Sequence, residues 1–325
     1  MEDRVERSAE VPAELHGARL DQAAAQLFPE FSRARLQAWI RSADLLKDQR
    51  PCRPRDKVEE GAVLSLHAAL QEAVTWAPQD MELNILYEDD AMIILDKPAG
   101  LVVHPAAGHA DGTLVNALLA HAHELARLPR AGIVHRLDRD TTGVMVVART
   151  LQAHHHLVAQ LQARQVKREY LAVCIGAMTG GGSVDEPIGR HPKQRKKMAV
   201  VATGGKSAIT HYRVERRFAH HTQIGVSLET GRTHQIRVHM AHRHHPLVGD
   251  PAYGGRPRIP AAATPQLIEA LRSFPRQALH ARALGLSHPD SGEMLQFDCP
   301  VPDDLCNLLS VLQREDAVES NPHRT

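Results

Sequence analysis

A short charged segment in the middle of the chain holds the residue types best suited to acid–base or nucleophilic chemistry. Two carboxylates, Asp138 and Asp140, alternate with Arg136 and Arg139 shortly before the apolar run 144–148. Cationic neighbours favour the ionised form of a carboxylate, and an ionised carboxylate can act as a nucleophile or stabilise positive charge. The same pattern is typical of a solvated surface loop, so this segment alone leaves both interpretations open.

Further blocks follow the same order as in a known enzyme family. Residues 135–143 spell His-Arg-Leu-Asp-Arg-Asp-Thr-Thr-Gly, which resembles the signature of the RluA family of pseudouridine synthases. Other matching blocks extend the resemblance to roughly residues 80–300; they span residues 96–105, 168–170, 231–239, 245–251 and 276–280. Within the family, the chain is similar to the branch that modifies the RNA of the large ribosomal subunit.

The resemblance implies a reaction and a role for four residues. The reaction breaks the C1′–N1 bond of a uridine, turns the uracil and rejoins C1′ to C5, without net redox change and without a metal or organic cofactor. Asp138 corresponds to the nucleophile, and Arg237 to the arginine that pairs with it and orients it. Tyr170 corresponds to the residue that stacks on the uracil and can assist proton removal from C5. Arg136 corresponds to the side chain that fills the space left by the flipped nucleotide.

Other functions compete with this interpretation. His239 and His242 are three residues apart, so a zinc-dependent hydrolase is conceivable, although no His-Glu-x-x-His pattern accompanies them. Taken singly, Tyr170 is more typical of an ordinary strand aromatic and Arg237 of a helix-surface residue, but their joint occurrence with the loop motif favours the functional interpretation. A non-catalytic ribosome-assembly factor, or a synthase for another ribosomal or transfer RNA uridine, also remains possible.

The distribution of charge indicates a polyanionic partner. The formal net charge is only +1, but residues 127–217 contain 17 Lys and Arg against 6 Asp and Glu. Basic side chains displace counterions from phosphates, so this excess favours binding to ribosomal RNA or a pre-ribosomal particle. The densest cluster is expected to contact phosphates and comprises Lys193, Arg195, Lys196 and Lys197.

The N-terminal part predicts a small separate unit. Apolar spacing indicates helices over residues 20–27 and 33–41, and alternation indicates a strand over 63–66. This order resembles an S4-type RNA-binding domain, although residues 42–49 lack the glycine and Asn-Gly turn usual in that family. Arg33, Gln37 and Arg41 share one face of the second helix and are the predicted RNA contacts.

The sequence as a whole predicts an α+β fold with a mixed or antiparallel sheet. We expect an S4-like domain over residues 1–70, a linker over 71–81, a catalytic domain over 82–312 and a polar, disordered tail over 313–325. Expected strands of the catalytic domain cover residues 92–95, 144–148, 170–175, 209–214 and 224–228. Expected helices cover residues 113–126, 152–164, 232–242 and 264–274.

Composition bounds the cellular setting. Apolar residues make up 43% and charged residues 24% of the chain, values typical of a globular protein. The N-terminal residues lack the apolar core of a secretion signal, and no stretch offers eighteen uninterrupted apolar residues. We therefore expect a cytoplasmic protein that acts as a monomer with no membrane contact. Its four cysteines lack metal-site spacing and are expected to be reduced thiols: Cys52, Cys174, Cys299 and Cys306.

Overall fold

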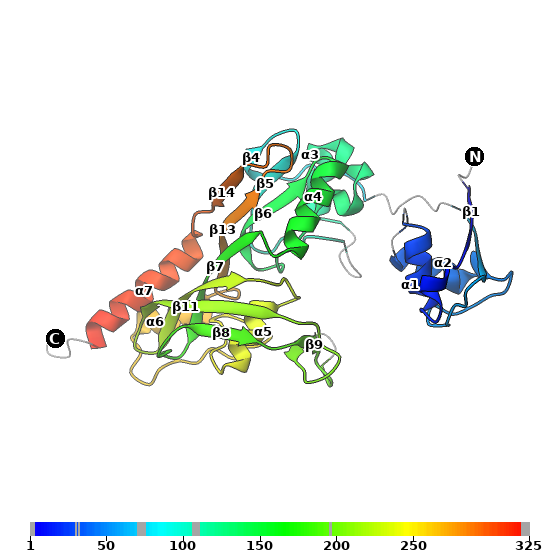
Figure 1. The fold of residues 1–325 in the computed structure, drawn as a ribbon. Coiled ribbons are helices and arrows are strands. Elements are labelled where there is room, and N and C mark those ends of the chain that lie inside the picture. The colour runs from blue at the N-terminus through cyan, green and yellow to red at the C-terminus, as the bar shows by residue number, and fades with distance from the viewer. Residues whose placement is uncertain are drawn as a thin grey trace. The chain divides into compact units, whose positions relative to one another are not determined.

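A computed structural model describes residues 4–29, 31, 33–69, 76–105, 111–194 and 197–319. The chain divides into two compact units, residues 1–75 and 76–325. The division lies within the segment 71–81 that was predicted as a linker. Figure 1 colours the first unit blue and the second from cyan to red.

The N-terminal unit is a three-stranded antiparallel sheet with two helices. Its strands are β1 (Arg4–Glu10), β2 (Leu45–Lys47) and β3 (Val63–Ala69), in the order β1-β3-β2. Helices α1 (Leu20–Leu27) and α2 (Arg33–Ser42) confirm the two predicted helices. The sequence patterns indicated only β3, because β1 carries few apolar residues and β2 is three residues long. The unit has its own apolar core, which includes Leu20, Leu36, Ile40, Leu45 and Leu64.

The second half of the predicted linker is bound to the second unit. Gln79 N–H donates to the carbonyl of Asn116 at 3.0 Å, and Asn116 Nδ2 donates to the carbonyl of Ala77 at 2.8 Å. The Gln79 side chain also accepts from the N–H of Gly112. Within the predicted linker, Ala77 and Gln79 therefore pair with helix α3 (Leu114–His121) and the residues before it, while residues 71–75 lie outside the described residues.

The second unit, residues 76–325, which contains the expected catalytic domain and is called the catalytic unit below, is built on a mixed nine-stranded sheet. The order is β4-β5-β6-β13-β7-β12-β11-β8, with β14 on β13; β13 and β6 run parallel and the other neighbours antiparallel. All five predicted strands are confirmed and lie in β5, β6, β7, β11 and β12. The sheet comprises β4 (Asn84–Glu88), β5 (Met92–Lys97), β6 (Thr142–Ala148), β7 (Lys167–Ile175), β8 (Gly182–Asp185), β11 (Ile209–Arg217), β12 (His221–Leu228), β13 (Leu279–Ser287) and β14 (Met294–Asp298).

Different helices pack beside different strands of the sheet (Figure 1). Helix α4 (Leu151–Gln162) packs beside β6, and α5 (Gln235–His242) packs beside β11 and a small hairpin, β9 (Ile188–Arg190) and β10 (Met198–Val200). The predicted helix 113–126 is broken, because α3 ends at His121 and a 3-10 turn covers His123–Arg127. Over the described ranges, no helix has the length and apolar character that crossing a membrane requires.

The C-terminal segment corrects the predicted disordered tail. Helix α7 (Asp303–Glu319) extends past residue 312 and packs against α6 (Pro265–Ser273). Glu315 is buried and accepts hydrogen bonds from both the N–H and the hydroxyl of Thr264, the residue that caps α6. The prediction was wrong for residues 313–319, because a charged residue in this polar stretch forms a tertiary cap, which composition does not reveal; residues 320–325 lie outside the described residues.

Candidate active site

Asp138 lies at the end of a chain of two ion pairs. Arg237, from helix α5, is 6% exposed and donates from Nη1 to Asp138 Oδ2 at 2.9 Å. The same guanidinium donates from Nε and Nη2 to Asp250, at 2.7 and 2.9 Å. Burial alone would lower the pKa of Arg237, but its hydrogen bonds and charge contacts with Asp250 and Asp138 outweigh burial and raise it. A permanently charged arginine therefore holds Asp138 in one orientation.

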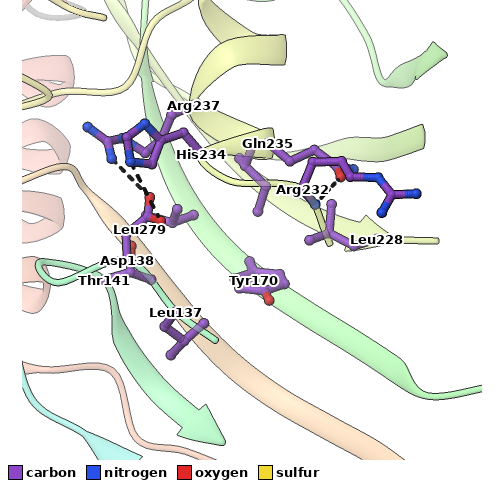
Figure 2. Close-up of a pocket in the computed structure, with 11 residues that line it drawn as sticks. Leu137, Asp138, Thr141, Tyr170, Leu228, Arg232, His234, Gln235, Arg237 and Leu279 are labelled. Atoms are coloured by element: carbon purple, nitrogen blue, oxygen red, sulfur yellow. Dashed lines mark hydrogen bonds and ion pairs between the residues drawn. The ribbon is translucent and has the colours of Figure 1, made fainter. Parts of the chain in front are cut away.

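Asp138 and Tyr170 face the same narrow pocket, of about 50 Å³ (Figure 2). Tyr170 comes from strand β7 and is buried, with Val226 and Ala281 opposite it on the neighbouring strands. Burial raises the pKa of Tyr170, and the charge of Asp138 adds to the effect while Arg168 opposes it. The phenol is thus held neutral beside a carboxylate, in a pocket with apolar walls that include Leu137, Leu228 and Leu279.

A buried lysine fixes the loop that carries Asp138. Lys97 is the last residue of β5 and is completely buried. Its ammonium donates to three carbonyls, those of Pro98, Leu101 and Arg139, at 2.6, 3.0 and 2.8 Å. Burial lowers the pKa of Lys97 to about 8, although Asp140 and Asp138 favour its charged form. The three bonds satisfy every proton of the ammonium and link the strand end to the residue after Asp138.

Close packing between strands β6 and β13 fixes the C-terminal end of the loop that carries Asp138. Gly143 pairs with Ala281 across β6 and β13 and has a φ of +115°. A Cβ at this position would lie 2.1 Å from the Ala281 carbonyl oxygen, so only glycine fits. Thr142 Oγ1 bonds His280 Nδ1 at 2.9 Å, and Gln277 donates to the hydroxyl of Thr141 at 3.1 Å. Segment 276–280 therefore supports the Asp138 loop, which gives this sequence block a structural role.

A histidine and a tyrosine complete the surroundings of Asp138. His234, with a left-handed φ of +57°, places Nε2 3.9 Å from Asp138 Oδ1, too far for a hydrogen bond. Tyr253 accepts the N–H of Met198 at 3.0 Å, so its hydroxyl proton is available for His234 Nδ1 at 2.8 Å. Burial lowers the pKa of His234, while Asp138 opposes that shift. The second oxygen of Asp138 thus remains open toward the pocket.

Comparison with known proteins identifies the fold around this pocket. Residues 91–242 match the family model described as RNA pseudouridylate synthase. The "Ribosomal large subunit pseudouridine synthase D" of Pseudomonas aeruginosa is 60% identical over 97% of this chain and 98% of its own. The protein of the same name from Escherichia coli K12 is 52% identical, over 97% of both chains. The chain belongs to the RNA pseudouridylate synthase family.

Solved structures agree with this assignment. The structure of "Human RNA Pseudouridylate Synthase Domain Containing 4" is 27% identical and has a TM-score of 0.56, over 71% of this chain and 93% of its own. That of "Human RNA Pseudouridylate Synthase Domain Containing 1" is 25% identical with a TM-score of 0.53, over 78% of this chain and 97% of its own. The synthase is therefore an isomerase that acts on RNA, as its sequence blocks predicted.

The remaining predicted RNA contacts of the synthase lie on its surface. Arg136 is exposed, two residues before Asp138, and does not line the pocket. Lys193 is exposed and Lys197 half-buried in the connection between β9 and β10, where the Lys197 N–H donates to the carbonyl of Gln194 at 2.7 Å. The other two predicted contacts of this cluster lie outside the described residues: Arg195 and Lys196.

In the N-terminal unit, the three predicted contacts differ in what they bind. Arg33 donates to the fully buried Asp21 at 2.7 Å, and Gln37 donates to the same oxygen at 2.5 Å. Arg41 is exposed and reaches Gln37 at 3.5 Å. Gln37 and Arg41 line a hollow of about 570 Å³, and its other charged residues are Arg19, Arg53, Arg55 and Asp56. Arg33 thus holds the fold of the unit together, whereas Arg41 belongs to a basic hollow.

One of the two histidines considered for zinc, His239, is already bonded to protein groups. His239 is completely buried; its Nε2 donates to the Glu186 carbonyl at 3.0 Å and its Nδ1 bonds Thr210 Oγ1 at 2.8 Å. Neither ring nitrogen of His239 is available to a metal. Among residues with described positions, no group of three or more His, Cys, Asp or Glu could hold a metal ion.

Two important residues lie in the matching sequence blocks but carried no predicted role. Asp250 binds Arg237 with two hydrogen bonds, whereas the resemblance gave Arg237 only Asp138 as a partner, to which it makes one. Lys97 was part of the block 96–105 but had no predicted partner. A buried lysine and a buried aspartate are rare unless paired, yet their burial cannot be read from local sequence.

Proposed function

We propose that this synthase converts specific uridines of large-subunit ribosomal RNA to pseudouridine, with Asp138 as the nucleophile and Arg237 and Tyr170 as its partners in the pocket. The observation that carries the proposal is the meeting of Asp138, Tyr170 and Arg237 at one pocket, although they are up to 99 positions apart in the chain. The identity of 60% and 52% with two ribosomal large subunit pseudouridine synthases supports the choice of RNA.

The geometry supports a division of labour in the proposed reaction. Arg237 occupies Asp138 Oδ2, so Oδ1 is the oxygen free to act at the sugar C1′ or at the uracil ring. Tyr170 has a raised pKa, so its neutral phenol is suited to stack on the base, and it could take the C5 proton only by passing its own hydroxyl proton to another group. The apolar walls would keep water from the detached uracil until C1′ rejoins at C5.

The proposal also covers the oligomeric state, the RNA contacts and the partner of the enzyme. The synthase acts as a monomer. The N-terminal unit acts as an S4-like RNA-binding domain through its basic hollow, and Lys193 and Lys197 add phosphate contacts. Exposed Arg136 takes the place of the flipped uridine in the RNA stack. The partner is ribosomal RNA or a pre-ribosomal particle in the cytoplasm.

The decisive experiment maps pseudouridines in total RNA from cells with and without the gene. The deletion strain should lose pseudouridine from defined positions of large-subunit RNA, and wild-type protein should restore them. A plasmid encoding Asp138→Asn should restore none. Loss only from transfer RNA or small-subunit RNA would redirect the substrate, and no loss anywhere would favour a non-catalytic assembly factor.

A further inference from the structure

A second cavity of about 430 Å³ lies beside the active-site pocket. The two share Arg232, whose side chain extends away from Asp138 in Figure 2. Strand β7 also contributes to both, with Tyr170 in the first and Arg168 in the second. Residues two apart on a strand point to the same face, roughly 6.6 Å from one another along the chain. The cavity therefore begins about one nucleotide step from the proposed position of the uracil.

Arg168 is the unusual residue of this cavity. It is 8% exposed, and no carboxylate in the described part of the chain forms an ion pair with it. Its Nη2 makes two long bonds of 3.3 Å, to the carbonyls of Leu228 and Glu229, and its Nε is buried with no hydrogen-bond partner. A buried cation without a counter-charge is costly, so an anion in the cavity would supply what the protein lacks.

The other polar groups around the cavity also favour an acceptor. His135 Nε2 accepts the N–H of Val146 at 3.1 Å, and burial together with Arg168 lowers the pKa of His135 to about 3. The neutral ring must therefore carry its proton on Nδ1, as a donor. The one carboxylate in the lining, Glu229, is already paired with Arg164 and His211. A group with acceptors only, such as a phosphate, matches this set.

We propose that this cavity binds the backbone phosphate next to the target uridine, through the guanidinium of Arg168 with Arg232 and His135 at its wall. The inference rests on the proposed function and extends it. Arg168 becomes a positioning residue, because a phosphate fixed two strand positions from Tyr170 sets how far the flipped uridine reaches toward Asp138. The sequence blocks alone indicate no such role for Arg168.

The test combines Arg168→Gln with RNA that carries one uncharged methylphosphonate linkage. The substrate is a short RNA with a single target uridine, prepared unmodified and with each flanking phosphate replaced in turn. For the wild-type enzyme, one flanking replacement should raise KM roughly tenfold, the effect expected when one charge-assisted hydrogen bond is removed. Arg168→Gln should raise KM by a similar factor on unmodified RNA, with little change in kcat. It should show no further loss on the RNA neutralised at that linkage.

Arg282→Gln is the matched control. Arg282 pairs with Glu169 and Glu215, and it lines neither pocket. This variant should respond to the neutral linkage as the wild type does. Thermal unfolding of both variants distinguishes a folding defect from a loss of phosphate binding. This measurement is needed because Arg168 also binds two carbonyls.

Several outcomes would overturn the inference. One is a wild-type enzyme that tolerates every neutral linkage, a result that needs no variant to fold. Another is an Arg168→Gln enzyme as sensitive to the linkage as wild type. A third is stabilisation of the wild type against thermal unfolding by inorganic phosphate while its KM depends on no RNA linkage. That result would assign the cavity to a free anion instead. A wild-type enzyme that modifies no uridine in this RNA or in ribosomal RNA would remove the proposed function and this inference together.

Discussion

The two units each place an aspartate among arginines, and they use it in opposite ways. Asp21 of the N-terminal unit is fully buried and accepts from Arg19, Arg33 and Gln37, so both of its oxygens are used within the fold. Burial would raise the pKa of Asp21, but these hydrogen bonds hold it well below its ordinary value. Such a carboxylate is fully satisfied and therefore structural.

In the catalytic unit, two carboxylates bind one arginine, Arg237, and differ in how completely they are bonded. Asp250 is buried and takes two bonds from Arg237 as well as the N–H groups of Ala252 and Tyr253. Asp138 takes one bond from the same guanidinium and keeps its other oxygen toward the pocket. In this comparison the carboxylate proposed to react, Asp138, is held by one partner and keeps one oxygen free, whereas the carboxylates that support the fold use both oxygens.

The largest effect is expected from Asp138→Asn. The amide keeps the shape of the side chain but lacks the nucleophilic charge, so turnover should fall by more than about a thousandfold while RNA binding persists. Pseudouridine formation in a short RNA measures the first effect and a filter-binding assay the second. Clean variant protein that still turns over would remove Asp138 from the nucleophile role.

The next largest effect is expected from Asp250→Asn. Without the second carboxylate Arg237 loses its buried counter-charge and its fixed orientation, so kcat should fall about a hundredfold with a smaller change in KM. Thermal unfolding should also occur at a lower temperature. Arg237→Lys is the companion variant, because lysine keeps the charge but cannot bridge two carboxylates. Equal activity of Asp250→Asn and wild type would show that Asp138 needs no such support.

Deleting the N-terminal unit tests whether it serves binding alone. Removal of residues 1–75 should weaken RNA binding by about tenfold or more, yet leave activity at high enzyme concentration, because Asp138, Tyr170 and Arg237 all belong to the other unit. The dependence of log affinity on log salt should also flatten, by roughly 0.7 for each single-strand phosphate that the truncated enzyme no longer neutralises. An unchanged salt slope and an unchanged set of modified uridines would make the unit structural.

A pH profile probes the lysine that holds the Asp138 loop. The pKa of Lys97 is lowered to about 8, so kcat should fall severalfold as the pH rises past 8 and the ammonium loses a donor. Between about pH 8 and the ordinary value of 10.5 the unfolded chain binds more protons, so this group makes folding more favourable as the pH rises. The decline in kcat therefore reflects the loop and not unfolding. Lys97→Met should be less active at all pH values and lack this alkaline decline.

The smallest catalytic effect is expected from Asp21→Asn. Activity at saturating RNA should be unchanged, while the unfolding midpoint of the N-terminal unit falls by several degrees at neutral pH. The lowered pKa of Asp21 stabilises the fold above its ordinary value of about 4, and this contribution disappears as the pH falls below it. The wild type and the variant should therefore converge in acid. A divergence in acid would contradict the proposed ion cluster.

Local patterns determined much of this protein. Apolar spacing predicted helices α1, α2, α4 and α6, and runs of β-branched residues predicted the central strands. The order of blocks around Asp138 indicated the family and the candidate pocket. These features are legible because each depends on residues close together in the chain, whose periodicity reflects which side is buried.

Tertiary structure alone decided the partners of the buried charged groups. Arg237 meets Asp250 from 13 positions away and Asp138 from 99, and Lys97 reaches the carbonyl of Arg139 across 42 positions. Glu315 likewise binds a distant residue, Thr264, and lies within helix α7 where a polar tail was predicted. Whether a charged group is solvated, paired or left with an unbonded acceptor or donor depends on which distant segments exclude water from it. The folded chain sets that environment, and a local sequence pattern does not contain it.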